Sequence, residues 1–150
     1  MLFAAALLFN AALIVLVILL HYESLFYLDR TLKRLRHIRP RLKVLVGVGI
    51  IFLTHVLEIW LFAAGYFLSL KIDGMGQIIG ETGNLFMDCV YLSFVTYTTV
   101  GYGDIVVQGY IRYLTGVEAL VGLILITWSA SFLFLEMQRY WSDQHKTPSI

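Results

Sequence analysis

The sequence is poor in cysteine and in charged residues, and both shortages exclude classes of protein. Cys89 is the only cysteine among 150 residues, so the chain has no internal disulfide framework and no metal site built from several cysteines. Charged residues make up 14% of the chain and apolar residues 59%. Soluble domains carry about 25% charged residues, so this composition indicates an integral membrane protein. The net charge of +1 gives no indication of a nucleic-acid partner.

Three apolar runs are long enough to cross a membrane, which takes about 20 residues in a helix. They cover residues 2–20, 44–70 and 113–135. The first run lacks a basic leader and a small-residue cleavage site, so residues 1–21 are expected to be a retained transmembrane helix and not a signal peptide. It also lacks regularly spaced arginines, which excludes a voltage-sensing helix of the arginine-rich kind.

Basic residues gather between the first and second runs. Seven of the eleven lysines and arginines lie in residues 22–43. Such loops remain cytoplasmic, which predicts an outside amino terminus and a cytoplasmic carboxyl terminus with a short tail at 137–150. Leucines recur there at helical spacing, which predicts an amphipathic helix on the cytoplasmic leaflet. These leucines are Leu25, Leu28, Leu32, Leu35 and Leu42.

The segment between the second and third runs divides into three parts. Residues 71–83 are polar and rich in glycine, which predicts an exposed extracellular turret. Residues 84–97 are apolar but too short to span, which predicts a re-entrant helix capped by Asn84. Residues 98–104, the stretch TTVGYGD, have neither helical nor strand periodicity. Such backbone is tolerated at membrane depth only where it is buried in protein or lines a water-filled path.

The stretch Thr99-Val100-Gly101-Tyr102-Gly103 can line a narrow tube with carbonyl oxygens. Successive carbonyl groups point the same way only if alternate residues adopt left-handed conformations, which glycine enters at little steric cost. Gly101 and Gly103 supply such positions. Val100 and Tyr102 are then expected to point away from the tube and to pack against the re-entrant helix.

A cation is the ligand that such a tube fits. Removing water from a monovalent ion is costly, and stacked carbonyl rings must replace the lost hydration. One chain offers only one wall, so several copies must surround an axis. The carboxyl end of the re-entrant helix carries roughly half a negative charge, which also favours a cation.

The motif TTVGYGD resembles the signature of the potassium-channel family, in which backbone carbonyls replace the hydration shell of the ion. The wider resemblance, to the pore module of small bacterial potassium channels, covers residues 44–136: outer helix 44–70, turret 71–83, pore helix 84–97, filter 98–104 and inner helix 112–136. It implies potassium preference, a homotetramer, a re-entrant pore helix and a filter loop. Together with the three apolar runs, this predicts an all-α membrane fold with three transmembrane helices. The first helix and its basic linker lie outside the resemblance.

The resemblance also implies roles for single residues. The carbonyls of Thr99, Val100, Gly101 and Tyr102 would coordinate potassium, with Gly103 completing the filter. Asp104 would be the acid at the outer mouth. The residues expected to support the filter from behind are Tyr91, Thr98, Asp104 and Glu118.

Two departures from the family pattern stand out. Many members have a tryptophan where Tyr91 stands, and we expect the Tyr91 hydroxyl to take over its hydrogen bond to Asp104. Some members have a glutamate where Val95 stands, so the acid-linked filter inactivation associated with that glutamate is not expected here.

His55 and Glu58 are three residues apart near the middle of the second run, so they share a helix face. Ionisable residues at this depth indicate function. The pair is either a proton sensor, because histidine titrates near physiological pH, or a buried polar pair that holds helices together. Haem ligation by His55 is disfavoured because His21 is expected near the cytoplasmic side.

The inner helix is expected to present one face to a central cavity. That face is read as Leu123, Ile126, Ala130 and Phe134, with Phe134 forming an apolar constriction. A shift of one residue would place Thr127 and Ser131 in the cavity instead. Phe134 would then only pack between helices, and the filter itself would be the gate.

These observations favour a passive potassium-selective channel over a non-conducting helical scaffold or accessory subunit. The chain is not expected to be an enzyme. No cofactor is expected, and potassium ions would be permeant ligands. The expected surroundings are the lipid bilayer of a cell membrane, which the resemblance suggests is a bacterial inner membrane, with no nucleic-acid partner.

Overall fold

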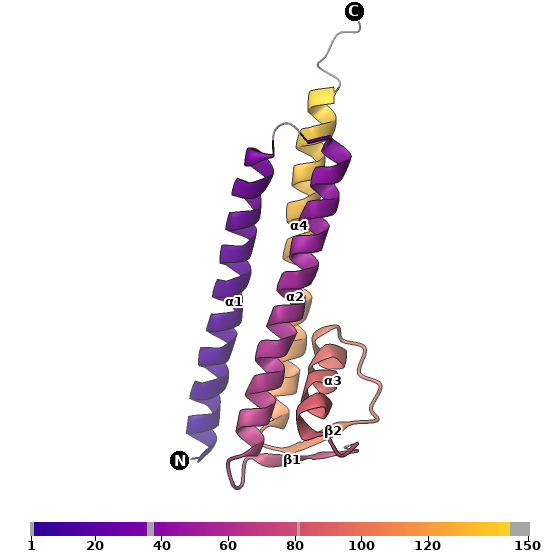
Figure 1. The fold of residues 1–150 in the computed structure, drawn as a ribbon. Helices are drawn as coiled ribbons and strands as arrows, with labels where there is room; N and C mark the ends of the chain where they lie inside the picture. The colour runs from indigo at the N-terminus through magenta and orange to yellow at the C-terminus, as the bar shows by residue number, and fades with distance from the viewer. Residues whose placement is uncertain (1, 36–37, 81, 145–150) are drawn as a thin grey trace, which may run out of the picture.

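The computed structural model describes residues 2–35, 38–80 and 82–144. Three long helices run side by side, and a short helix and a two-stranded sheet lie together at one end of them (Figure 1). The elements in chain order are α1 (Leu2–Arg34), α2 (Pro40–Leu70), β1 (Gly76–Ile79), α3 (Leu85–Tyr97), β2 (Val106–Gly109) and α4 (Arg112–Gln144).

The three long helices are apolar and long enough to cross a membrane. The candidate spans are Leu2–Arg34, Arg41–Leu70 and Arg112–Arg139. This confirms the predicted helical membrane fold with three spanning helices. Helix α4 continues past the predicted end at 136, so the tail expected at 137–150 is helical as far as Gln144, and its last six residues lie outside the described part of the chain.

Helix α1 corrects the expectation of a separate surface helix at 22–43. It continues without a break from Leu2 to Arg34. Leu25, Leu28 and Leu32 are buried and pack with Ile51 of α2. A leucine stripe at helical spacing fits a neighbouring helix as well as a membrane surface, and periodicity alone does not separate the two.

Helix α3 begins where the sequence predicts. The Asn84 side chain accepts a hydrogen bond from the Met87 backbone N–H at 3.2 Å, which satisfies one of the unpaired amides of the first turn. Asp88, in the same turn, accepts from the Thr82 backbone N–H at 3.0 Å and from its hydroxyl at 2.7 Å. The start of the helix is thereby tied to the segment that precedes it.

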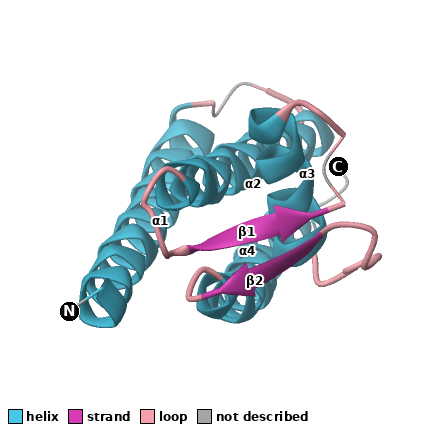
Figure 2. Ribbon diagram, turned by 90° about the horizontal axis from the view of Figure 1, so that it is seen from below, coloured by secondary structure: helices cyan, strands magenta, loops and turns pink. Residues whose placement is uncertain are grey.

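The predicted exposed turret contains a strand. Strand β1 pairs with β2 in an antiparallel sheet in which Ile78 lies opposite Val107 (Figure 2). Both side chains are buried, and so is Met75 just before the strand. The polar, glycine-rich composition concealed this strand because its partner lies about 30 residues later, on the far side of the filter segment. The sheet therefore joins the chain that enters the pore region to the chain that leaves it.

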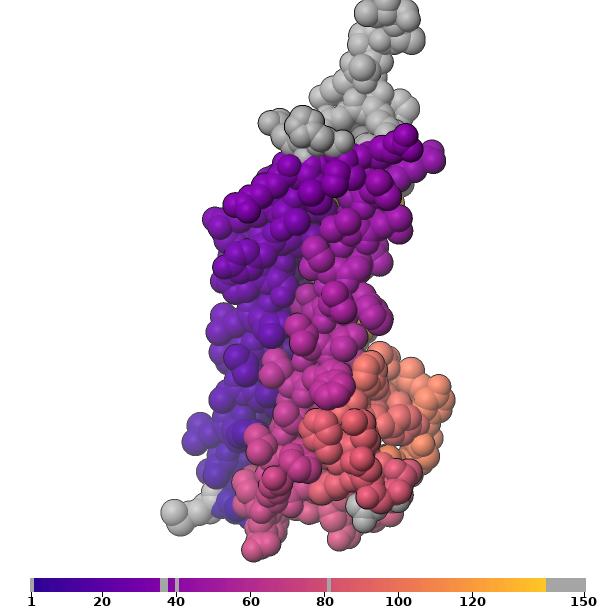
Figure 3. Space-filling view, in the orientation of Figure 1, coloured from indigo at the N-terminus to yellow at the C-terminus, as the bar shows by residue number. Residues whose placement is uncertain are grey.

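Helix α2 is at the centre of the packing. Its buried residues Phe62, Ala63 and Tyr66 belong to a core that also includes residues of α1, α3 and α4. The first turn of α1 lies at the sheet end of the molecule, where Phe3 and Tyr110 have ring centroids 5.7 Å apart. The end of α4 lies at the opposite end, and the space-filling view shows α3 and the filter segment as a lobe beside α2 (Figure 3).

Candidate functional site

The segment between α3 and β2 follows the end of the short helix directly. The Thr99 backbone N–H donates to the Thr96 carbonyl at 2.9 Å, and the Gly101 N–H donates to the Val95 carbonyl at 3.0 Å. The Thr98 hydroxyl donates to the Phe94 carbonyl at 2.7 Å. The start of the filter segment is thus held on the last turn of α3, and Thr98 supports it through this local bond.

The sign of the backbone angle φ alternates along the filter segment. Thr99, Gly101 and Gly103 have φ values of 60°, 52° and 80°, whereas Val100 and Tyr102 between them do not have positive φ. This is the alternation required for successive carbonyl groups to point to one side. The sequence predicted it at the two glycines but not at Thr99.

Thr99 is the one non-glycine residue with positive φ in the described part of the chain. A β-branched residue in this conformation is strained, at a cost of about 1–3 kcal/mol. Such strain persists only where the surrounding structure imposes it, and it gathers at functional sites.

Val100 and Tyr102, which were expected to pack against α3, are largely exposed. Their side chains are 53% and 74% exposed in the single chain. A pocket of about 410 Å³ lies instead between the filter segment, α3, β2 and the start of α4. The residues that line it include Leu92, Val95 and Gly103.

The predicted contact between Tyr91 and Asp104 is present. The Tyr91 hydroxyl donates to Asp104 Oδ2 at 2.7 Å. This hydrogen bond favours the charged carboxylate and holds the pKa of Asp104 below its usual range. It joins α3 to the residue that follows the filter.

Glu118 of α4 is fully buried behind the filter and accepts hydrogen bonds from two other elements. Tyr66 of α2 donates to Oε2, and Ser93 of α3 lies 2.5 Å from Oε1. The Ser93 hydroxyl is also 2.8 Å from the Ile59 carbonyl of α2. Glu118 thereby joins α4 to α2 and α3 from a buried position, and its role in supporting the filter stays a prediction.

Gly122 allows α4 to approach the end of α3 closely. A Cβ atom at this position would lie 2.2 Å from the Tyr97 carbonyl oxygen. A glycine at this position is therefore explained by close packing of the two helices.

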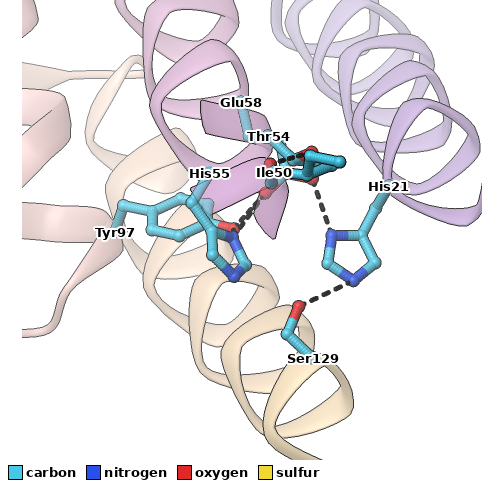
Figure 4. Close-up of polar contacts among 7 residues, drawn as sticks. All are labelled: His21, Ile50, Thr54, His55, Glu58, Tyr97 and Ser129. Atoms are coloured by element: carbon cyan, nitrogen blue, oxygen red, sulfur yellow. Dashed lines mark hydrogen bonds and ion pairs between the residues drawn. The ribbon is translucent and has the colours of Figure 1, made fainter. Parts of the chain in front are cut away.

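A second polar cluster lies between α1, α2, α3 and α4 (Figure 4). The Glu58 carboxylate lies 2.8 Å from His21 Nδ1 and 2.9 Å from His55 Nδ1. The Tyr97 hydroxyl donates to Glu58 Oε2 at 2.5 Å and is 2.9 Å from His55 Nδ1. Ser129 of α4 lies 3.3 Å from His21 Nε2. His55 and Glu58 are thus a polar pair with two further partners, His21 and Tyr97, and Ser129 contacts the pair only through His21.

The expected place of His21 near the cytoplasmic side was wrong. Because α1 continues to Arg34, His21 lies in the middle of the helix, and its ring is 5.4 Å from that of His55. The argument against haem ligation from a missing second histidine therefore fails. Both rings instead present Nδ1 to one carboxylate. His21 is the first ionisable residue after the apolar run at 2–20, and this position was the signal available in the sequence.

The predicted cavity face of α4 is exposed in the single chain. Its four residues are Leu123, Ile126, Ala130 and Phe134. Thr127 and Ser131, which belong to the alternative face, are exposed as well and donate to the carbonyls four residues earlier. The single chain leaves both faces open to a cavity or to neighbouring copies.

A comparison with protein families bears on this arrangement. The family model described as ion channel matches residues 54–139. The match includes α3, the filter segment and the contacts of Glu118. It also includes the residues around Glu58 apart from His21. No curated protein and no solved structure matches the chain.

Proposed function

Because the chain belongs to the ion channel family, we propose that it is a potassium-selective channel, in which four copies surround a pore lined by the carbonyls of residues 99–102. The observation that carries this proposal is the alternation of backbone hand at Thr99, Gly101 and Gly103 within the sequence TVGYG. Carbonyl rings of this kind replace the hydration shell of potassium.

Two features support assembly around an axis. A single filter strand supplies one wall only, so ion coordination needs other copies. Val100 and Tyr102 are large apolar side chains that the single chain leaves exposed, and contact with a neighbouring copy would bury them. The exposed face of α4 is available to line a common cavity below the filter.

The arrangement of the ends supports the proposed orientation in a cell membrane. The amino end of α1 lies beside the sheet, whereas the basic residues at the end of α1 lie at the opposite end (Figure 1). With the basic end in the cytoplasm, the turret and the amino terminus are outside and the end of α4 is inside. The resemblance to bacterial pore modules extends this proposal to a bacterial inner membrane.

Flux measurements on the chain reconstituted in vesicles test the function. We expect a potassium gradient to drive flux and a sodium gradient of the same size to drive little. The control is Gly101→Ala, which places a side chain at φ 52° and should abolish the flux. Absence of flux in the folded wild type would favour the non-conducting scaffold, and equal fluxes of both ions would reject potassium selectivity.

A further inference from the structure

The ligand atoms of His21, His55 and Glu58 lie close enough together to hold one metal ion. One imidazole nitrogen from each histidine and one carboxylate oxygen are all within 4.8 Å of one another. In a tetrahedral zinc site the ligand atoms are roughly 3.4 Å apart, at metal–ligand distances of about 2.0–2.2 Å. His21 Nδ1 lies 2.8 Å from Glu58 Oε1 and His55 Nδ1 lies 2.9 Å from Glu58 Oε2, so small shifts of these side chains would bring both nitrogens and one oxygen to that spacing.

The donor set and its surroundings match those of zinc centres. Two imidazoles and one carboxylate are a common set of protein ligands for zinc with an open fourth position. Ligating histidines usually have a hydrogen-bond partner on their other nitrogen, and Ser129 lies 3.3 Å from His21 Nε2. The figure shows this arrangement, with the serine on the far side of the His21 ring from Glu58 (Figure 4).

Tyr97 can supply the fourth ligand and balance the charge. Its hydroxyl oxygen lies 2.5 Å from Glu58 Oε2 and 2.9 Å from His55 Nδ1, so it is close enough to reach an ion held by the other three ligands. A dication bound by one carboxylate, one phenolate and two neutral imidazoles is neutral overall, which a low-dielectric interior requires. One proton, that of the Tyr97 hydroxyl, would be released to solvent for each ion bound.

We propose that His21, His55 and Glu58, with the Tyr97 oxygen, form a binding site for a zinc-type divalent cation that joins α1 to the pore module. His21 and Glu58 are fully buried, whereas the His55 side chain is 16% exposed and leaves the cluster accessible from one side. Tyr97 is the last residue of α3, directly before the filter segment. An ion here would fix both the extra helix and the end of the pore helix.

Metal binding to the full chain, purified as the folded oligomer without a histidine tag, tests this site. After removal of metal by a chelator and addition of zinc, we expect the wild type to bind one zinc ion per chain and to show a higher melting temperature than without zinc. Cobalt in place of zinc should give the intense visible absorption of a four-coordinate site. None of these measurements depends on ion conduction, so they stand apart from the flux assay.

Matched variants locate the ion. His21→Gln should reduce bound zinc strongly, and Ser129→Ala should weaken affinity by about 10–100-fold through loss of the partner of the His21 ring. The controls are His37→Gln and His145→Gln, the other two histidines of the chain, which should bind as the wild type does. A folded wild type that binds no zinc, or a His21→Gln variant with unchanged binding, would overturn the proposal.

Discussion

Among single residues, Thr99 has the backbone conformation that most clearly indicates a functional site. It adopts a left-handed conformation that a β-branched side chain avoids, and the two filter glycines adopt the same hand at the next alternate positions. Around it, the backbone bonds to Thr96 and Val95 hold the chain against α3. Substitutions of Tyr91, which contacts Asp104, and of Gly122, which contacts Tyr97, test two further contacts of this region separately.

Tyr91→Phe removes the hydrogen bond to Asp104 and keeps the ring. Because the bond lowers the pKa of Asp104, its stabilisation is complete above the ordinary aspartate pKa of about 3.9 and is lost as external pH falls through the lowered value. We expect the variant to lose current at a higher external pH than the wild type and to hold the conducting state for a shorter time. Single-channel recordings across external pH measure both.

The control for this change is Tyr110→Phe, another exposed tyrosine near the sheet end. It should behave as the wild type. If Tyr91→Phe and the wild type share one acid response, the bond to Asp104 does not stabilise the conducting filter.

Gly122→Ala would place a methyl group 2.2 Å from the Tyr97 carbonyl oxygen. Overpacking of this kind costs about 1–3 kcal/mol, so we expect a lower melting temperature of the purified oligomer. Gly116→Ala is the matched control, because a Cβ there meets nothing within 4 Å. Equal melting temperatures for both variants would mean that α4 can move away from α3 at little cost.

At the scale of elements, the inner helix α4 has one face that packs against the other helices and one that is exposed. Val121, Gly122, Leu125 and Ser129 are buried against the other helices, and the remaining residues from 121 to 129 are exposed. Phe134 is on the open face and is 56% exposed. Four such rings converging below a cavity can exclude water and block ions.

Phe134→Ala tests this constriction. Loss of the four rings should raise open probability while potassium selectivity remains, and a tenfold rise corresponds to about 1.4 kcal/mol. Leu135→Ala is the control, because Leu135 is also 56% exposed but lies on the next helical position. Unaltered gating in Phe134→Ala would assign the gate to the filter.

The elements that were predictable from sequence are those with local signals. Asn84 marks the start of α3 through its own side chain, and the three spanning helices follow from the lengths of apolar runs. Strand β1 was missed because its partner is distant in sequence. The extent of α1 was missed because its leucine stripe fits a membrane surface as well as α2.

Within the candidate site, the left-handed conformations of Gly101 and Gly103 were predictable, because glycine adopts them at little steric cost. Apart from His55, the partners of Glu118 and Glu58 were not predictable, since Ser93, Tyr97 and His21 come from other helices and no spacing relates them. The contact of Tyr91 with Asp104 was an exception, because the resemblance to a known pore module supplied the pairing.

At the scale of the whole molecule, the exposed filter side chains predict that assembly depends on Tyr102. Burial of a large apolar side chain contributes about 1.5–3 kcal/mol, and four copies would each contribute one. Tyr102→Ala should therefore shift the purified channel from tetramer toward smaller species in native mass spectrometry. Tyr22→Ala, which removes a tyrosine that is 51% exposed on α1, should leave the tetramer intact.

The exposure of Tyr102 and Val100 also has a consequence for biogenesis. In the proposed assembly, a newly inserted subunit would expose both side chains until sister subunits cover them. An orphan subunit would then differ from a completed channel by an exposed apolar surface that membrane proteases can recognise. Under the same proposal, quality control would remove unassembled subunits by recognising the segment that lines the pore in the completed channel.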